Sequence, residues 1–376
     1  MPKVSIVVCC YNQEKTIACC VNSLLRQSFA DLEVIVVNDG STDRTETICE
    51  KLRKRDDRVK LISKNNEGRM LARYTGYKEA SGEFVVFTDG DDYHPRTSIE
   101  CLYELAEKNQ VDCVVGNCYR VFGSFPWVKK KRTISIAGAL LRGDEKWRRC
   151  FGYANNNVLG DHLPGEMWAR IYKKSCIDKA VAADPARVFQ ECLLEDWWFN
   201  LTTMAYLDSM YITDEPVYYY RCGGSSEGDY PFLERSNEYF NYRYSYFNSL
   251  LELDPDSSRD ELLMRTFICF VECLIKEARL KVGAHKYSDM EICAFIDDQL
   301  SCNSIIKWMS NHADMVPLSY KKKAILAIEK DSNGILAIAK SHYEQLRSRR
   351  IITGPIIRTY DGLCDVVERL FGGIQL

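Results

Sequence analysis

The first hundred residues alternate between short apolar runs and segments whose apolar positions repeat every three or four residues. The apolar runs predict four strands, at residues 4–8, 32–37, 59–62 and 84–87. The helical spacing is found in residues 14–27, 44–53 and 69–80. Strands that alternate with helices at this pitch predict an α/β protein with a mostly parallel, doubly wound sheet.

The pattern becomes mixed after residue 110 and changes again near residue 230. The mixed part predicts a strand at 111–115, an exposed basic loop at 129–132, an edge strand at 166–174, a helix at 192–207 and an aromatic strand at 216–221. Later apolar positions repeat at helical spacing, at Leu263, Phe267, Phe270, Leu274, Ala278 and over residues 325–339. The expected organisation is therefore an α/β domain (1–229, with halves 1–110 and 111–229) and an α-helical C-terminal domain (230–376).

The composition is that of an ordinary globular protein, with 46% hydrophobic and 27% charged residues, which argues against wholesale disorder. The net charge of −3 gives no reason to expect a nucleic-acid partner, which needs clustered excess Lys and Arg. The 17 cysteines are scattered and never form a Cys-x-x-Cys spacing, which disfavours zinc-ribbon and redox motifs. We interpret them as reduced structural thiols of a cytoplasmic protein.

The two ends of the chain bear on whether the protein attaches to a membrane. No apolar run approaches the roughly 20 residues that a membrane-spanning helix needs, and residues 4–8 are too short for a signal peptide. The C-terminal end carries a basic cluster at 347–350 and then an amphipathic stretch at 351–376. That stretch suits either packing on its own protein or peripheral contact with the anionic inner face of the cell membrane.

Closely spaced carboxylates follow the fourth predicted strand, at Asp89, Asp91 and Asp92. The carboxyl ends of parallel strands form the ligand-binding edge of such a sheet. Carboxylates gathered there repel each other unless a cation neutralises them, and Mg²⁺ or Mn²⁺ completed by diphosphate oxygens is a natural occupant. An EF-hand is disfavoured because its fifth and sixth positions are Tyr93 and His94. A plain acidic turn stays open as an alternative.

A second polar turn, residues 38–43, follows the second predicted strand and places Asp39 at the same edge. An acidic side chain there is well placed to accept hydrogen bonds from a ribose hydroxyl or a base N–H. Asn-Asp-Gly is also favourable turn chemistry. The residues alone leave both interpretations open.

Together, these segments resemble the family 2 glycosyltransferases of GT-A fold over about the first 95 residues. The matching stretches are residues 4–12 (VSIVVCCYN), 38–43 (NDGSTD), 65–76 (NNEGRMLARYTG), 80–84 (ASGEF) and 89–92 (DGDD). Cys9 departs from the family, which usually has proline here. Because this position supplies mostly backbone contacts, we expect binding to be kept. The resemblance implies a Rossmann-like GT-A catalytic domain and does not reach the helical region after about residue 235.

The resemblance also implies roles for matching residues in binding a nucleotide-sugar donor. Tyr11 is expected to stack against the base, and Asp39 to bind uracil or ribose. Asn66 and Arg73 are expected to help hold the nucleotide and its diphosphate.

The remaining implied roles belong to acidic residues. Asp89 and Asp91 would form the D-x-D pair for Mg²⁺ or Mn²⁺, with Asp91 the direct ligand and Asp89 also beside the donor. Residues 195–199 (EDWWF) resemble the Glu-Asp motif of an acceptor-side helix. Asp196 would be the general base of an inverting displacement, with Glu195 orienting it. Carboxylates that open a helix also simply complement its dipole.

Two further segments resemble a subset of the family that makes bacterial surface polysaccharides. Residues 168–173 (WARIYK) match a Trp-x-Lys-Leu-Tyr stretch with Arg170 in place of lysine, and residues 217–226 (VYYYRCGGSS) match a Tyr-Arg and Ser loop. Arg221 would meet the diphosphate or serve as a structural surface residue. The side chains suited either to a sugar-stacking wall or to core packing are Trp168, Trp197 and Trp198.

We interpret the sequence as a metal-dependent, inverting glycosyltransferase that moves a sugar from a UDP-sugar to a hydroxyl of a glycan or lipid-linked acceptor. A sugar-1-phosphate nucleotidyltransferase would want a Gly-rich basic loop after the first strand, and residues 10–14 (CYNQE) are not one. A non-catalytic nucleotide-sugar-binding protein is the other alternative. The intact Asp89, Asp91 and Asp196 argue against it.

Overall fold

The chain divides into two compact units, one formed by Met1–Cys150 and Asp161–Glu227, the other by Phe151–Gly160 and Gly228–Leu376. The computed structural model describes residues 2–122, 129–132, 134, 136–143, 145–146, 166–189, 195–222, 259–302, 304–316, 318–345 and 347–348. The predicted amphipathic tail and the loop at 223–226 lie outside the described residues.

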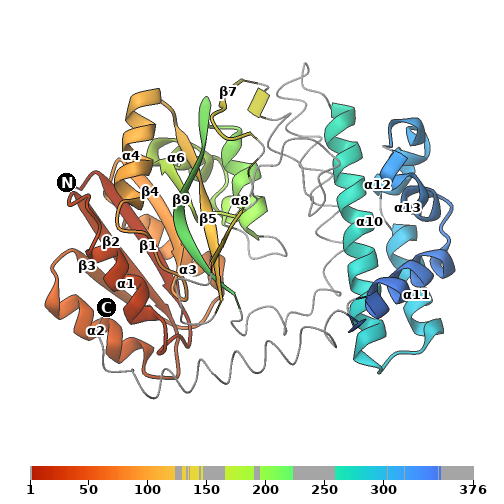
Figure 1. Ribbon diagram of the computed structural model, residues 1–376, viewed down its shortest axis with the longest axis horizontal. Helices are drawn as coiled ribbons and strands as arrows, with labels where there is room; N and C mark the ends of the chain where they lie inside the picture. The colour runs from red at the N-terminus through yellow and green to blue at the C-terminus, as the bar shows by residue number, and fades with distance from the viewer. Residues whose placement is uncertain are drawn as a thin grey trace. The chain divides into compact units, whose positions relative to one another are not determined.

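The described strands of the first unit form one sheet in the order β3-β2-β1-β4-β8-β5-β9-β7, with β6 paired to β5 (Figure 1). Their bounds are β1 Val4–Cys10, β2 Leu32–Asp39, β3 Val59–Lys64, β4 Phe84–Asp89, β5 Cys113–Phe122, β6 Lys129–Lys131, β7 Leu140–Arg142, β8 Arg170–Lys173 and β9 Ser209–Cys222. Strand β1 pairs in parallel with β2 and β4, β2 with β3, and β5 with β9. The sheet is therefore mostly parallel, as the sequence predicts.

Two segments differ in the structure from the elements predicted for them. Residues 166–174 contain β8, which is an interior strand because it pairs antiparallel with both β4 and β5. Its Ile171 and Tyr172 are fully buried, as an interior strand requires. The basic run 129–132 is not simply an exposed loop, because β6 pairs antiparallel with β5.

Helices cover both faces of this sheet. Their bounds are α1 Ile17–Leu25, α2 Thr45–Arg55, α3 Arg69–Lys78, α4 Ser98–Asn109, α6 Lys174–Ala183, α7 Pro185–Val188 and α8 Glu195–Met204. Alternate residues of β1, such as Ile6 and Val8, pack in a core with α1, α2 and α4. Val7, between them, lies under Gly76 of α3 on the opposite face. Strands buried on both faces explain the continuous apolar runs in the sequence.

An aromatic cluster fills the face of the sheet that carries α3 and α8. Phe87 of β4 packs edge-on against Tyr172 of β8 and Phe199 of α8. Phe189, which follows α7, contacts Phe87, Phe199 and Tyr77 of α3. This packing fixes the position of α3 and α8 relative to the end of β4.

The described part of the second unit is helical. It contains α10 Arg259–Ala284, α11 Asp289–Cys302, α12 Ser304–Ser310, the 3₁₀ helix η2 Ala313–Met315, α13 Leu318–Ile328 and a further helix at 332–345. Of the apolar positions predicted for α10, Phe267, Phe270, Leu274 and Ala278 are buried. The pattern over 325–339 is split between two helices at Lys330, which adopts a positive φ of 57°.

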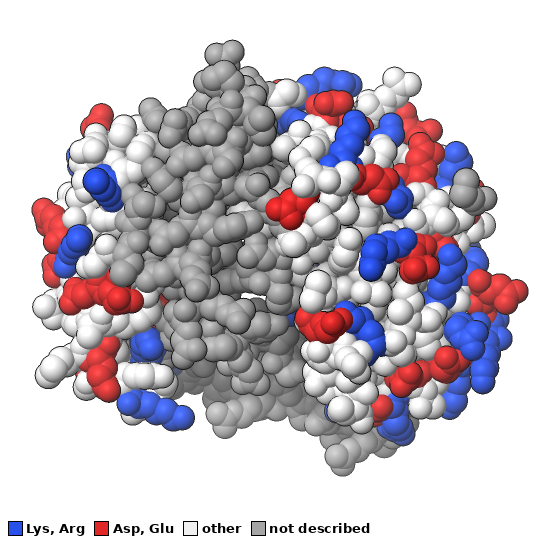
Figure 2. All heavy atoms as spheres, turned by 180° about the vertical axis from the view of Figure 1, so that it is seen from behind, with Lys and Arg blue, Asp and Glu red and all other residues white. Residues whose placement is uncertain are grey.

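No helix among the described residues is both long enough and apolar enough to cross a bilayer. On the face drawn in Figure 2, acidic and basic side chains are interspersed over the described surface. That face gives no single-signed field where its residues are described.

Candidate active site

Asp39 ends β2 and fixes the loop that leads into α3. Its carboxylate is buried and accepts hydrogen bonds from the backbone N–H groups of Glu67 at 3.1 Å and Gly68 at 3.0 Å. The Lys64 ammonium lies 3.9 Å away. Gly40 follows with φ +74°, and a Cβ there would lie 2.5 Å from the backbone N of Asn66. Only glycine fits this close crossing of the two loops.

The loop after β1 is tied to the loop after β2. Asn12 donates its backbone N–H to Ser41 Oγ at 3.0 Å, and its side-chain oxygen accepts from the backbone N–H of Thr42 at 2.8 Å. Tyr11 is 48% exposed on this loop, and the Asn66 side chain is also exposed. Both predicted donor-binding residues therefore present their side chains to solvent at the carboxyl end of the sheet.

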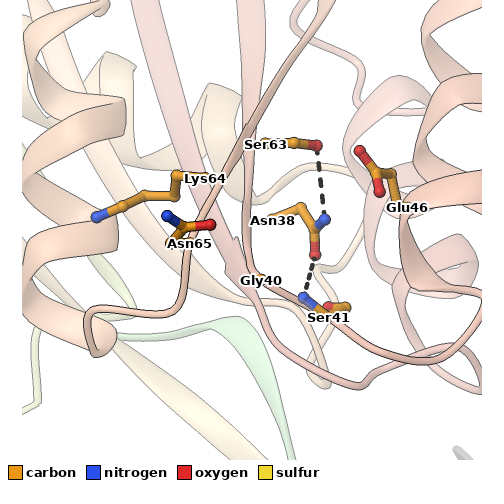
Figure 3. Close-up of a pocket in the computed structure, with 7 residues that line it drawn as sticks. All are labelled: Asn38, Gly40, Ser41, Glu46, Ser63, Lys64 and Asn65. Atoms are coloured by element: carbon orange, nitrogen blue, oxygen red, sulfur yellow. Dashed lines mark hydrogen bonds between the residues drawn. The ribbon is translucent and has the colours of Figure 1, made fainter.

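A polar pocket of about 490 Å³ opens beside these loops (Figure 3). It is lined by Asn38, Gly40, Ser41, Glu46, Ser63, Lys64 and Asn65. Asn38 bridges its two sides, donating to Ser63 Oγ at 3.5 Å and accepting from the backbone N–H of Ser41 at 3.3 Å. The pocket thus lies at the predicted nucleotide-binding edge.

The acidic loop after β4 starts with a residue that has to be glycine. Gly90 donates its backbone N–H to Cys9 O at 3.0 Å. A Cβ on Gly90 would lie 3.0 Å from both Cys9 O and Cys10 Cβ, and 2.2 Å from Gln13 Oε1. The loop therefore crosses the end of β1 at backbone contact distance.

The two aspartates after Gly90 have different surroundings. The buried Asp92 accepts hydrogen bonds from Tyr218 Oη at 2.9 Å and from the backbone N–H of Arg221 at 2.7 Å. Asp91 is only partly buried, and no other described residue hydrogen-bonds its carboxylate. Burial raises the pKa of Asp91, and the nearby charge of Asp89 raises it further. Burial raises the pKa of Asp92 as well, but the two hydrogen bonds occupy that carboxylate, so Asp91 is the carboxylate of this loop left open to a cation.

Strand β9 fastens the acidic loop from the other side. The Tyr218 hydroxyl accepts the backbone N–H of Asp89 at 3.2 Å while it contacts Asp92. The guanidinium of Arg221 donates through Nε to the backbone carbonyl of Asp91 at 2.8 Å and lies 5.4 Å from the ring centre of Tyr93. Arg221 therefore lies alongside the loop and contacts its backbone.

Arg73 joins the two acidic motifs that the sequence singles out. It is buried on α3, and its Nη2 donates to Asp89 Oδ1 at 2.8 Å while its Nη1 donates to Asp196 Oδ1 at 2.5 Å. One guanidinium therefore spans from the end of β4 to the first turn of α8. Burial raises the pKa of Asp196 and the Arg73 charge opposes this. Burial acts likewise on Asp89, but the charges of Arg73 and Arg69 outweigh it and lower the pKa.

A second ion pair lies one helical turn away. Arg69 Nη1 donates to Glu195 Oε1 at 2.7 Å. Burial raises the pKa of Glu195, and the adjacent Asp196 adds to the increase. Helix α3 thus presents two arginines to the two carboxylates that open α8.

The comparisons with known proteins decide the family. Residues 5–177 match the family model "Glycosyl transferase family 2". The chain is also 32% identical over 250 residues to the uncharacterized glycosyltransferase EpsJ of Bacillus subtilis, covering 65% of this chain and 68% of EpsJ. The chain belongs to glycosyltransferase family 2. It is a glycosyltransferase, which sets aside the nucleotidyltransferase and the non-catalytic alternatives.

Other similarities cover smaller shares or concern the fold alone. A GalNAc(5)-diNAcBac-PP-undecaprenol beta-1,3-glucosyltransferase of Campylobacter jejuni is 36% identical over 120 residues, which are 31% of this chain and 38% of that one. Staphylococcus aureus TarS 1–349 in complex with UDP-GlcNAc has a TM-score of 0.65 at 19% identity, covering 91% of this chain and 92% of that one. This glycosyltransferase therefore has the GT-A fold of TarS.

Several site contacts of this glycosyltransferase were missed at the sequence level. Arg69 and Tyr218 are both absent from the predicted site, although Arg69 precedes Arg73 by one helical turn and so shares its face. The buried role of Asp92 was missed too. No local pattern points to Tyr218, because its partners lie more than 120 residues away in the chain.

The sequence leaves open whether three tryptophans form a sugar-stacking wall or pack in the core. The structure answers this for the two whose side chains are described. Trp168 is buried and stacks on Tyr218 and Tyr220, with ring centres 4.7 and 5.4 Å apart. Trp198 is fully buried. Both are core residues, and the Trp197 side chain lies outside the described part.

Proposed function

We propose that this glycosyltransferase is metal-dependent and inverting, and that it moves a sugar from a UDP-sugar to an acceptor hydroxyl with Asp196 as the general base. The observation that carries the proposal is the Arg73 guanidinium, which binds Asp89 of the acidic loop and Asp196 of α8 at once. A leaving-group site and a proton acceptor within the span of one side chain are what a single displacement needs.

Three features support a UDP-sugar donor. TarS, which shares the fold, binds UDP-GlcNAc. The half-exposed Tyr11 offers a ring face for the base. Asp39 and Asn66 lie on loops that touch at Gly40, beside the pocket of Figure 3. We assign uracil or ribose to the Asp39 loop and part of the nucleotide to Asn66.

The donor set at the acidic loop fits Mg²⁺ or Mn²⁺. The Asp91 carboxylate accepts no hydrogen bond from another described residue, and one oxygen of Asp89 is free of Arg73. No group of three or more metal-binding side chains is found in the described part of the chain. An ion here would therefore take one or two carboxylates and complete its shell with diphosphate oxygens and water, as Mg²⁺ commonly does. When bound, it would stabilise negative charge on the leaving diphosphate.

The protein residues supply the proton transfer and the orientation. The acceptor oxygen attacks the anomeric carbon, the bond from that carbon to the diphosphate oxygen breaks, and the hydroxyl proton passes to a carboxylate oxygen of Asp196. Glu195, held by Arg69, orients the first turn of α8. Arg221 supports the acidic loop from β9.

The class of acceptor is proposed from the relatives of this chain and is less specific than the proposed donor. The Campylobacter jejuni relative is named as acting on an undecaprenol-linked saccharide. We propose a glycan or lipid-linked saccharide of the bacterial surface as acceptor, with residues 1–229 as the catalytic domain and residues 230–376 as a separate helical domain. A cytoplasmic enzyme, peripheral on the inner membrane face through its tail, is consistent with that substrate.

A donor screen with Mn²⁺ tests the proposal by measuring UDP release from a panel of UDP-sugars, with and without acceptor extracts. Asp91→Ala is expected to abolish metal-dependent UDP binding. Asp196→Asn is expected to leave UDP binding intact and lower turnover by at least about 100-fold, a typical contribution of general-base catalysis. Asp289→Asn, at a 66% exposed carboxylate of α11, is the matched control. Full turnover in Asp196→Asn would contradict the assignment of the base.

A further inference from the structure

Arg73 is almost completely enclosed by the protein. Its side chain is 2% exposed, and both Nη atoms donate to carboxylates. Nη1 also contacts the sulfur atoms of Met70 and Met167, at 3.4 and 3.5 Å. Nε is also buried, with no hydrogen-bond partner among the described residues. A diphosphate therefore reaches this guanidinium only if the residues that enclose it move.

The planar fork of arginine suits the observed bridge. Two Nη groups in fixed geometry hold two carboxylates at a set separation, whereas the lysine ammonium is a point charge on a flexible stem. Asp89 and Asp196 carry like charges in a buried setting, so they would move apart without the cation between them. Arg73 therefore determines their separation.

Arg69 repeats the arrangement one turn earlier on α3. Its side chain is 36% exposed, and its partner Glu195 is adjacent to Asp196 at the start of α8. Two arginines four residues apart on one helix thus hold two consecutive acidic residues of another helix. The first turn of α8 is fixed at two points, and a rotation of that turn would break both pairs.

We infer that Arg73 is a positioning residue that acts through Asp89 and Asp196, with Arg69 acting likewise through Glu195, and that Arg73 is not a ligand of the donor diphosphate. The inference rests on the proposed function, because Asp89 is assigned to the leaving-group side and Asp196 to the base. It differs from the role that the family resemblance implies for Arg73.

The test separates binding from turnover in Arg73→Lys, Arg69→Lys and a control, Arg53→Lys. Arg53 forms a surface ion pair with Glu50 on α2, far along the helix from the site loops. The UDP dissociation constant is measured by calorimetry in EDTA, where Asp89 cannot act on UDP through a metal ion. The values of kcat and KM are measured with Mn²⁺ and the UDP-sugar found active. Thermal unfolding is recorded for each variant.

The positioning role predicts that Arg73→Lys lowers kcat by about 10- to 100-fold, as small misplacements of reacting groups do, with metal-free UDP affinity within about threefold of wild type. Arg69→Lys is expected to lower kcat less, and Arg53→Lys not at all. A tenfold or greater loss of metal-free UDP affinity in Arg73→Lys, or an unchanged kcat, overturns the inference.

Failure of the proposed function is distinguishable, because it appears as absent UDP release in the wild-type enzyme. If Arg73→Lys does not fold, Arg69→Lys and Glu195→Gln decide the question. Action through Glu195 predicts that Arg69→Lys has a smaller effect on kcat in the Glu195→Gln background than in the wild type. Equal effects in both backgrounds overturn the role of Arg69.

Discussion

The acidic residues of the site differ in the groups that bind their carboxylates. Asp89 and Asp196 share the guanidinium of Arg73, and Asp92 is held by a hydroxyl and a backbone N–H. Asp91 has no such partner among the described residues. Residues that look equivalent in the sequence thus differ: Asp92 is held by the scaffold, Asp89 and Asp196 share a cation, and the Asp91 carboxylate is left without a hydrogen-bond partner among the described residues.

At this scale, Gly90→Ala is expected to displace the acidic loop. Its Cβ would meet Cys9 O and Cys10 Cβ at 3.0 Å, and neither the carbonyl nor a Cβ moves without the β1 backbone. Such overpacking typically costs about 1–3 kcal/mol, and we expect metal-dependent UDP affinity to fall with it. Chemical denaturation and UDP calorimetry measure the two effects.

The double variant Gln13→Ala, Gly90→Ala is the control for the clash with the Gln13 side chain. Because the backbone contacts remain, we expect only partial recovery of affinity. Full recovery would show that the flexible side chain alone imposes the glycine.

His94 makes stability depend on pH. It is buried between Thr88 and Ser98, and burial lowers its pKa to about 3. Below the ordinary histidine pKa of about 6.5 the unfolded chain binds a proton that the folded protein does not, so the stability that neutral His94 contributes is lost as pH falls. The loss approaches about 1.4 kcal/mol per pH unit between about 6.5 and 3.

Urea unfolding of wild type and His94→Asn between pH 7.5 and 5 checks this expectation. The variant is expected to be less stable at pH 7.5, because its hydrogen bonds change, but to lose less stability on acidification. His285→Asn, at an exposed residue with positive φ, is expected to keep the wild-type slope. Identical slopes for wild type and His94→Asn would contradict the buried neutral histidine.

At the scale of elements, the sequence pattern predicts best what is decided locally. The strands β1, β2, β3 and β4 follow from apolar runs and turn residues, because a strand buried on both faces has to be apolar throughout. The interior place of β8 was not predictable, since this short strand includes Arg170 and Lys173 and its position depends on pairing with β4 and β5. Pairing partners far apart in the chain leave no periodic signal.

The candidate site, too, was predictable from the sequence only where it depends on local pattern and topology. The positions of Asp39 and Asp89 at strand ends follow from the parallel topology, which brings strand carboxyl ends to one edge. That Arg73 binds both Asp89 and Asp196 depends on how α8 packs against α3, through aromatic contacts from residues 87 to 199. Such packing is not encoded in any single stretch.

Strand β9 gives a prediction at the element scale. Tyr218→Phe leaves Asp92 Oδ2 and the backbone N–H of Asp89 without their partner in a buried setting, which costs about 1–3 kcal/mol. We expect lower stability and weaker metal-dependent UDP binding, since the loop that carries Asp91 loses its support. Tyr211→Phe on the same strand is the control, and equal effects of both substitutions would contradict a specific role of the Tyr218 hydroxyl.

At the scale of the whole molecule, every residue of the candidate site belongs to the first unit. The match to the family model ends at residue 177, so the carboxylates at 195 and 196 lie beyond it and are connected to it through α3.

The cysteines give the last prediction, which concerns the chain as a whole. The ten cysteines described individually are free thiols, and most are buried. Burial raises the pKa of Cys9 and Cys113 to about 12 and that of Cys118 to about 11, so their reactive thiolate is scarce at pH 8. Cys19 on α1 is exposed.

Alkylation of the native enzyme with iodoacetamide at pH 8, read site by site by mass spectrometry, is therefore expected to modify Cys19 at least about tenfold faster than Cys9, Cys113 or Cys118. In denaturant the four rates should converge, because burial no longer protects any of them. Cys19→Ser is the control that removes the fast site. A fold that contains free thiols and no disulfides does not depend on oxidation, so a reducing agent should leave the unfolding temperature unchanged. A decrease would contradict the interpretation that these cysteines are reduced and pack in the core.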